Sequence, residues 1–233
     1  MKNMELPFIK DMFDAIAPTY DFLNRLLSLR QDVVWRRKLV SSLNIPSGGK
    51  VLDVACGTGD VMLEIFRHRS DAAVTGVDFS AAMLSRADEK IRRLSKTPCL
   101  AAADAFYLPF RDWSFDAVTI AFGIRNIGDK PAVLKAFHRC LKPGGTVGVL
   151  ELATPENRLL YDAYLLYFQK ILPAVGGIFS KHTHAYRYLP ASVVRFPSPR
   201  VFVGMMQQAG FRRIRRRPLT MGIANLYIGE KAE

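Results

Sequence analysis

Acidic side chains and a glycine turn give this 233-residue sequence its clearest chemical signal. Residues 51–60 read VLDVACGTGD, a short β-favouring run followed by Gly57, Thr58 and Gly59. A strand that ends in such a turn and continues into a helix exposes backbone N–H groups, and open α/β sheets bind nucleotides there. We therefore expect a nucleotide-like ligand at this turn, although the glycine spacing alone also occurs in dehydrogenases.

Two features of the turn disfavour a dinucleotide. The third glycine of the dinucleotide fingerprint, which lets the helix pack on the strand, is replaced here by Met62. Asp53 and Asp60 flank the turn, and a pyrophosphate gains little from neighbouring carboxylates. The turn is better suited to a ligand that carries positive charge and no phosphate.

Further acids fall at the ends of the next two predicted strands. Asp78 stands about 20 residues beyond the turn, where a carboxylate can accept hydrogen bonds from both ribose hydroxyls. Asp104 is placed to bind the exocyclic amine of adenine, and Ala105 can offer its backbone N–H to a ring nitrogen. Singly, Asp78 or Asp104 could be a helix N-cap or a turn residue. Because three acids fall in order at three successive strand ends, together they predict S-adenosylmethionine as the ligand, with S-adenosylhomocysteine as the product.

A parallel sheet is needed to bring these residues to one edge. Helical patterns of about ten to fifteen residues separate the β-favouring runs, which is typical of right-handed βαβ units. The runs lie at 50–56, 72–79, 98–104, 114–122 and 145–152. The sequence therefore predicts an α/β fold with a doubly wound, mostly parallel, Rossmann-like seven-stranded sheet. Residues 211–231 predict two strands that form an antiparallel C-terminal edge.

Helical segments accompany the predicted sheet. Residues 1–45 predict an N-terminal cap of two or three helices broken at Pro18. Residues 46–233 form the domain that carries the sheet, with a helical insertion at about 156–197 that includes an amphipathic helix ending near Pro173. The length suits one structural domain overall.

Composition is that of an ordinary globular protein, 49% hydrophobic and 23% charged. No signal-peptide pattern and no run of about 18 apolar residues occurs, so we expect a cytoplasmic protein. Cys56, Cys99 and Cys140 lack CxxC spacing, which favours reduced thiols. His182 and His184 form an HxH without a third ligand at useful spacing, so no metal is expected.

Part of the net charge of +12 lies at residues 211–218, FRRIRRRP, which contain five arginines. Such a patch attracts nucleic acid, acidic lipid or an acidic substrate. A strand edge that arginine protects from sheet-to-sheet aggregation is an equally good interpretation.

With the strands placed, the chain resembles the class I S-adenosylmethionine-dependent methyltransferases. More narrowly, it is similar to the ubiquinone/menaquinone biosynthesis C-methyltransferase family (UbiE/MenG type), nearly end to end. The resemblance rests on FDAIAPTYDFLNRLLS, LDVACGTGD, GVDFSAAML, SFDAVTIAFGIRNIGDK, LKPGG, YRYL and LTMGIANLYIG. The glycine turn and LKPGG indicate only the fold, whereas APTYD, FGIRN and YRYL are far more specific.

The resemblance implies methyl transfer from S-adenosylmethionine to a ring carbon of a polyprenylated quinol, demethylmenaquinol or the benzoquinol equivalent. Many members carry a serine where this chain has Ala121, so a hydroxyl contact to the cofactor is absent there or supplied elsewhere. The implied cofactor-binding positions are Asp53, Gly57, Thr58, Gly59, Asp78, Asp104, Ala105 and Ala121.

Arg125 and Asn126, in FGIRN, are the candidate catalytic residues. A quinol ring carbon is a good nucleophile only when the neighbouring hydroxyl is nearly deprotonated, and a free phenol has a pKa of about 10. A guanidinium at the carboxyl end of the sheet can stabilise the oxyanion and lower that pKa. Asn126 would orient the hydroxyl or a water that carries the proton towards Asp104. Alternatively, Arg125 and Asn126 merely cap the following loop.

Aromatic residues could wall the quinol ring or present phenols to it, although each could equally be a core residue. These candidates are Phe13, Tyr20, Phe122, Tyr186 and Tyr188. A polyprenyl tail must come from a bilayer, so we expect apolar helices to line a tunnel. We also expect peripheral contact with the anionic inner face of the membrane, without insertion. No nucleic-acid partner is expected, and the sequence is compatible with a homodimer.

Other functions stay open on sequence. A methyltransferase of the same fold could act on another phenol, an amine or a sterol. RNA binding or methylation is suggested by the charge, but the Asn/Asp-Pro-Pro-aromatic segment that often follows the fourth strand in such enzymes reads AFGIRN here. A cofactor-binding protein without catalysis is disfavoured because the acids and the candidate site residues are all present.

Overall fold

The computed structural model describes residues 6–167 and 183–233, of which 6–8 and 183–187 are described by their backbone alone. The predicted helix end near Pro173 and the side chains of the HxH pair therefore lie outside the described part of the chain.

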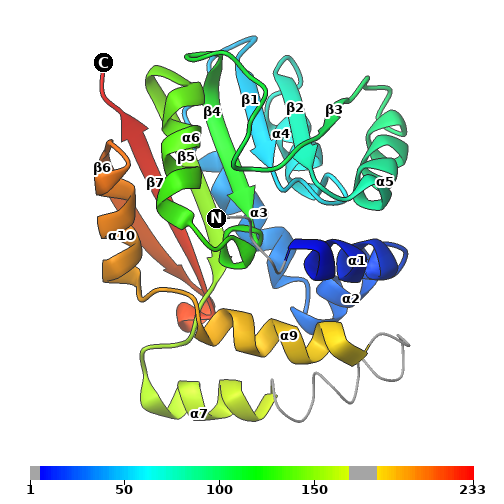
Figure 1. Ribbon diagram of the computed structural model, residues 1–233, viewed down its shortest axis with the longest axis vertical. Helices are drawn as coiled ribbons and strands as arrows, with labels where there is room; N and C mark the ends of the chain where they lie inside the picture. The colour runs from blue at the N-terminus through cyan, green and yellow to red at the C-terminus, as the bar shows by residue number, and fades with distance from the viewer. Residues whose placement is uncertain (1–5, 168–182) are drawn as a thin grey trace.

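One seven-stranded sheet forms the centre of the molecule, in the order β3-β2-β1-β4-β5-β7-β6 (Figure 1). Strands β1 to β5 are parallel, and β7 runs antiparallel between β5 and β6. The strands are β1 (Lys50–Val54), β2 (Ala73–Asp78), β3 (Cys99–Ala102), β4 (Phe115–Ala121), β5 (Leu141–Leu152), β6 (Phe211–Leu219) and β7 (Ala224–Lys231). The predicted fold class and antiparallel C-terminal edge are confirmed, while β5 begins at Leu141 rather than Gly145.

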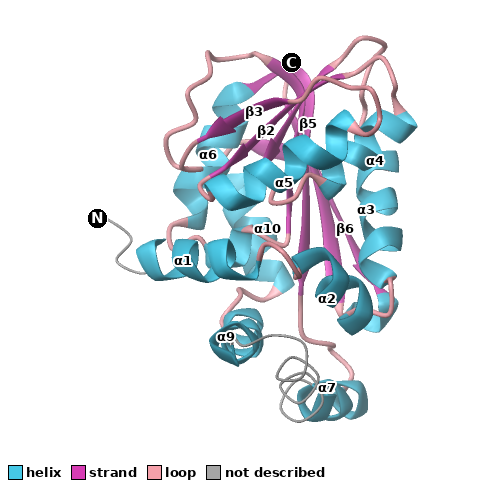
Figure 2. Ribbon diagram, turned by 90° about the vertical axis from the view of Figure 1, so that its right-hand side faces the viewer, coloured by secondary structure: helices cyan, strands magenta, loops and turns pink. Residues whose placement is uncertain are grey.

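Helices cover both faces of the sheet (Figures 1 and 2). One face carries α3 (Gln31–Ser41), α4 (Asp60–His68) and α5 (Ala81–Arg92), and the other carries α6 (Lys130–Cys140) and α10 (Pro199–Gln208). Local sequence sets where two of these helices begin. The Ser80 hydroxyl accepts a hydrogen bond from the Met83 amide at the start of α5, and the Asp129 carboxylate accepts one from the Ala132 amide at the start of α6.

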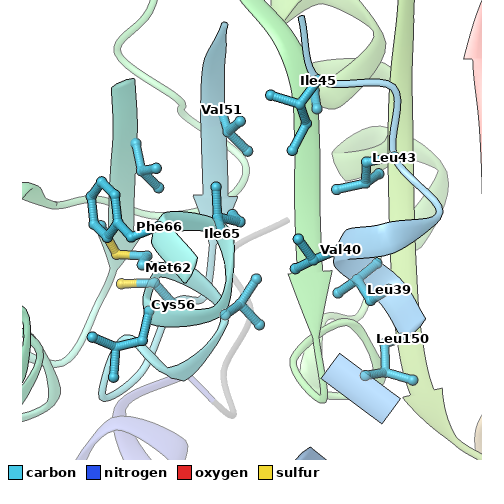
Figure 3. Packing of buried hydrophobic residues seen from close by; sticks show 14 of the residues in the cluster. Leu39, Val40, Leu43, Ile45, Val51, Cys56, Met62, Ile65, Phe66 and Leu150 are labelled. Carbon is cyan, nitrogen blue, oxygen red and sulfur yellow. The ribbon is translucent and has the colours of Figure 1, made fainter. Parts of the chain in front are cut away.

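The two largest apolar clusters among the described residues lie one on each face of the sheet, and two smaller clusters lie among the helices at its carboxyl end. Figure 3 shows the α3 side chains Leu39 and Val40 near Leu150 of β5. A Cβ on Gly148 would lie 2.5 Å from Leu39 Cδ1, so the absence of a side chain there lets α3 pack closely on β5. Helix α3 thus belongs to the layer that covers the sheet, although the sequence groups it with the cap of residues 1–45; that domain boundary stays a prediction.

The remaining helices lie beyond the carboxyl ends of the parallel strands (Figures 1 and 2). These are α1 (Leu6–Ile16), α2 (Tyr20–Leu27), α7 (Arg158–Leu166) and α9 (Thr183–Val194). The short helix η1 (Ile124–Asn126) follows β4 at the same end, and η3 (Thr220–Gly222) joins β6 to β7. No helix in the described residues is long and apolar enough to cross a membrane.

Candidate active site

A cavity opens at the carboxyl ends of β1, β2 and β4. We call it the first cavity. Its wall includes Gly57, Asp78, Asp104, Ala105 and Ala121, five of the eight predicted cofactor positions. Because parallel strands present their carboxyl ends at one edge, residues far apart in sequence meet here.

Asp78 is held rigidly at the wall of the first cavity. Its Oδ2 accepts a hydrogen bond from the Gly57 amide at 2.8 Å, and its Oδ1 accepts one from the Ser80 amide at 2.9 Å. Burial raises the pKa of Asp78, while hydrogen bonds from backbone N–H groups act in the opposite direction. Each carboxylate oxygen can accept more than one hydrogen bond, so the group fits the ribose hydroxyls predicted for it.

Asp104 and Ala105 lie on the wall of the same cavity, after β3. The Asp104 Oδ1 accepts a hydrogen bond from the Phe106 amide at 3.0 Å, which folds the segment into a local turn. The alternative interpretation as a turn residue is therefore correct for the backbone. It is compatible with adenine binding, since a carboxylate has acceptor capacity beyond this one bond.

Asp53 is 1% exposed and lies on a smaller cavity beside the first. Its Oδ1 accepts a hydrogen bond from the Thr119 hydroxyl at 2.7 Å, whereas Oδ2 has no hydrogen-bond partner among the described residues. Burial raises the pKa of Asp53 to about 7. A buried carboxylate oxygen without a partner is costly, so this atom fits the cationic part of S-adenosylmethionine.

The other end of the glycine turn is occupied by the protein's own groups. Asp60 forms ion pairs with Arg36 at 3.3 Å, with Arg25 at 3.5 Å and with Lys90. The Thr58 hydroxyl, on the wall of the smaller cavity, donates to Asp21 Oδ1 at 2.6 Å. Of the two acids that flank the turn, Asp53 rather than Asp60 thus keeps acceptor capacity for a ligand.

Gly59, also predicted to contact the cofactor, serves helix packing in the structure. Its φ is +80°, it precedes α4, and a Cβ there would lie 3.1 Å from Ala87 Cβ of α5. The first cavity's described lining contains Gly57 but not Gly59.

A second cavity lies against the first, between α1, α2 and α9. Phe13 and Tyr20 line both cavities. Their rings make an edge-to-face contact with centroids 6.0 Å apart. Arg125 and Tyr188 line the second cavity as well, so the structure brings four of the predicted residues together around it.

Phe122 and Tyr186 complete the predicted aromatic set. Phe122 lines the first cavity, and its ring lies 5.5 Å from the Arg36 guanidinium and 6.1 Å from the Trp35 ring. Tyr186 is part of α9, and its side chain lies outside the described residues.

Arg125 forms a buried ion pair that the sequence did not predict. Its Nη1 donates to Glu151 Oε1 at 2.7 Å and to the Phe122 carbonyl at 2.5 Å, and its backbone N–H donates to Glu151 Oε2 at 3.0 Å. Burial alone would lower the pKa of Arg125, but the Glu151 carboxylate raises it. The Arg125 Nε is buried and has no hydrogen-bond partner among the described residues.

Asn126 faces the first cavity, whereas its neighbour Arg125 faces the second. The Tyr188 hydroxyl donates to Asn126 Oδ1 at 3.1 Å, which ties α9 to η1. The two catalytic candidates therefore line adjoining cavities, and the bond from Arg125 Nη1 to the Phe122 carbonyl is also compatible with the interpretation as a loop cap.

Besides Glu151, sequence reasoning missed Lys90 of α5. Its Nζ donates to Asp21 Oδ2 at 2.6 Å, to Thr58 Oγ1 at 3.1 Å and to Asp60. It thus joins α2 to the glycine turn. Its place in the helical pattern 81–92 is that of an ordinary surface lysine, and no sequence signal marks it.

The strand order and the acids at the ends of β1 and β2 and after β3 define a class I S-adenosylmethionine-dependent methyltransferase. Within that class, the chain belongs to the ubiE/COQ5 methyltransferase family, whose model matches residues 1–231. The expected enzyme class, an S-adenosylmethionine-dependent C-methyltransferase, is confirmed. No group of three or more metal-ligating side chains occurs in the described part of the chain.

Similar proteins cover almost the whole chain. The "Ubiquinone/menaquinone biosynthesis C-methyltransferase UbiE" of Geotalea daltonii is 47% identical, over 96% of this chain and 96% of its own. The "Demethylmenaquinone methyltransferase" of Thermus thermophilus is 43% identical, over 94% of this chain and 100% of its own. Among solved structures, a SAM-dependent methyltransferase from Thermotoga maritima superposes with a TM-score of 0.66 at 19% identity, covering 95% and 99% of the two chains, which shows a shared fold.

Proposed function

We propose that this enzyme transfers a methyl group from S-adenosylmethionine to a ring carbon of a polyprenylated quinol, a demethylmenaquinol or the benzoquinol equivalent. Family membership and the names of the two relatives support this substrate class. The observation in the structure that supports the proposal is Arg125, which lines the cavity that adjoins the first cavity and whose buried Nε has no hydrogen-bond partner among the described residues.

The first cavity and Asp53 would hold the cofactor, with Asp78 at the ribose and Asp104 and Ala105 at the adenine. S-adenosylmethionine supplies a methyl group that its sulfonium already activates, so the protein must align the ring carbon and favour the phenolate. Arg125 Nε donates to the quinol oxygen and stabilises the phenolate through a charge-assisted hydrogen bond. Glu151 holds the guanidinium in place and offsets its charge. Arg125 therefore stabilises the phenolate through this direct hydrogen bond and not through its net charge at a distance.

Asn126 orients the substrate hydroxyl or the water that carries its proton away. Tyr188 fixes the Asn126 amide by donating to its oxygen, which leaves the amide N–H₂ group to donate towards the first cavity. Phe13 and Tyr20, which line both cavities, hold the ring between the two sites.

Substitution of Arg125 by lysine tests this role. Arg125→Lys keeps a positive charge for Glu151 but removes the Nε donor, so we expect kcat to fall about 100-fold, as when an oxyanion donor is removed. Affinity for S-adenosylmethionine, measured by calorimetry, should stay unchanged because Arg125 does not line the first cavity. Near wild-type turnover in the folded variant would contradict the assignment.

The substrate class is tested with labelled S-adenosylmethionine. The purified enzyme is incubated under reducing conditions with demethylmenaquinol, a benzoquinol precursor and bulk RNA in separate samples. We expect label on the ring carbon of one or both quinols, resolved by chromatography and mass spectrometry. Label in RNA alone, or in no sample despite cofactor binding, would contradict the quinol assignment and leave the fold and family intact.

We further propose peripheral contact with anionic membrane. In support, β6 forms the edge of the sheet and exposes most of the arginines of residues 211–218. Two of them form ion pairs, Arg213 with Glu230 at 3.2 Å and Arg216 with Glu156 at 2.7 Å, which leaves the patch positive. Binding to anionic vesicles should weaken steeply as salt rises from about 50 to about 300 mM. Salt-insensitive recovery in the supernatant would contradict this contact.

A further inference from the structure

A third cavity lies between the α2–α3 turn, α7, α9 and η3. None of its described lining residues is charged. The apolar side chains on its wall include Leu27, Leu29, Leu152, Leu160, Leu189 and Ile223. A cavity this apolar is unsuited to a polar metabolite, because it offers no charged group to orient one.

Several polar groups on the wall of the third cavity bond to one another or to backbone. The Trp35 Nε1 donates to the Thr220 hydroxyl at 2.9 Å, and that hydroxyl donates to Gln31 Oε1 at 3.1 Å. The Tyr167 hydroxyl donates to the Leu27 carbonyl at 2.7 Å. With these groups satisfied internally, an apolar chain can enter the cavity without leaving them unpaired.

The three cavities follow one another through shared walls. Phe13 and Tyr20 line both the first and the second, and Leu27 and Leu189 line both the second and the third. A ligand whose polar ring lies in the second cavity would therefore extend any long substituent past Leu27 into the third.

Two turns on the wall of the third cavity present exposed apolar side chains. Leu29 is 81% exposed with a φ of +50°, and Met221 is 68% exposed with a φ of +56°. Residues other than glycine rarely adopt such angles, and large apolar side chains gain nothing from exposure to water. Both side chains also line the cavity, so they mark where an apolar chain would enter it.

We propose that the third cavity is the binding site for the isoprenoid tail of the quinol, which enters between Leu29 and Met221. The inference rests on the proposed function for its ligand. It goes beyond that function by assigning the tail a site built from α2, α7, α9 and η3.

Binding of an isoprenoid alcohol without a quinol ring tests the cavity independently of catalysis. Trp35 lines the cavity, and the chain's other tryptophan, Trp113, is 62% exposed elsewhere, so Trp113→Phe leaves a single reporter. We expect saturable quenching of Trp35 fluorescence by geranylgeraniol. Ala163→Phe, which narrows the cavity from α7, should weaken that binding at least tenfold. Leu159→Phe is the matched control, since Leu159 is 78% exposed on the same helix and does not line the cavity.

Kinetics then separate the tail site from the ring site. With Ala163→Phe we expect KM to rise at least tenfold for a quinol with four isoprene units and to stay unchanged for the tail-less quinol. Equal changes for both quinols, or equal effects of Ala163→Phe and Leu159→Phe, would overturn the proposal. Should Ala163→Phe fail to fold, Ile223→Phe makes the same test from the opposite wall. If the wild type methylated no quinol, only the proposed function would be contradicted. Geranylgeraniol binding would still test whether the third cavity binds an isoprenoid chain.

Discussion

Asp53 combines burial, one hydrogen bond and a raised pKa at a site that we assign to a cationic ligand. Burial raises its pKa from 3.8 to about 7, so the folded state holds the proton more tightly than the unfolded chain does. Between about pH 4 and pH 7 the folded state therefore binds more protons, and this residue's contribution to stability falls as pH rises through that window. Above pH 7 the buried Asp53 carboxylate is ionised, which lowers the free energy of unfolding, and a bound cation would offset this loss.

Asp53→Asn should separate stability from ligand affinity. Without ligand at pH 8, we expect the variant to be more stable than wild type by roughly 2–4 kcal/mol, because the amide needs no deprotonation in the buried site. The difference should vanish near pH 4, and affinity for S-adenosylmethionine at pH 8 should fall. Urea unfolding at the two pH values and calorimetry measure these quantities. A stability difference independent of pH would contradict the prediction; Asp162→Asn on the exposed side of α7 is the control.

For single residues, the order of the predicted strands along the sequence was sufficient to place Asp53 and Asp78, because the ends of strands in a parallel sheet meet at one edge. Glu151 could not be predicted in the same way. It ends a buried strand as one more acid, and its importance comes from Arg125, 26 residues away in sequence, which only the β4–β5 pairing brings within 2.7 Å.

Among the elements, the turn between β1 and α4 depends on two glycines with different tasks. Gly57 has a φ of +53°, and a Cβ added to it would meet no atom within 4 Å, whereas Gly59 has a φ of +80° and the packing contact with α5. A side chain at Gly57 would strain only the backbone, but one at Gly59 would also push α4 away from α5.

We expect Gly59→Ala to cause the larger loss of stability and Gly57→Ala the larger loss of affinity for S-adenosylmethionine. Gly59→Ala should lose roughly 2–3 kcal/mol of unfolding free energy, and Gly57→Ala about 1 kcal/mol, because only the former adds overpacking to backbone strain. Gly57→Ala should weaken S-adenosylmethionine binding more, since Gly57 lines the first cavity. Denaturant titration and calorimetry give both orders; the same order in both would contradict this division of tasks.

The elements themselves follow from sequence where the pattern is local. Alternating β-favouring and helical runs predict the parallel strands, and Ser80 and Asp129 mark helix starts. The role of α3 could not be predicted, because its contacts with β5 form across more than a hundred residues and depend on the bare backbone of Gly148.

For the whole molecule, Lys90 connects the helices over the site to the sheet domain. Lys90→Met removes its bonds to Asp21, Thr58 and Asp60. Loss of a hydrogen bond to a charged group costs about 1.5 kcal/mol, so amide hydrogen exchange in α2 should accelerate roughly tenfold while α10 is unchanged. Hydrogen exchange with mass spectrometry measures this, with Lys135→Met on the exposed side of α6 as the control. Acceleration spread evenly over both helices would show global destabilisation instead.

The place of β7 in the sheet has a consequence during synthesis of the chain. β7 pairs with β5 from Thr146↔Glu230 to Leu152↔Ala224, and β6 joins the sheet through β7. A chain grows from its N-terminus, so β1 to β5 emerge from the ribosome while the outer edge of β5 still lacks its partner. Until the eight residues of β7 emerge, that edge can pair with another nascent chain. The pairing of β7 with β5 therefore decides whether each new molecule completes its own sheet or aggregates.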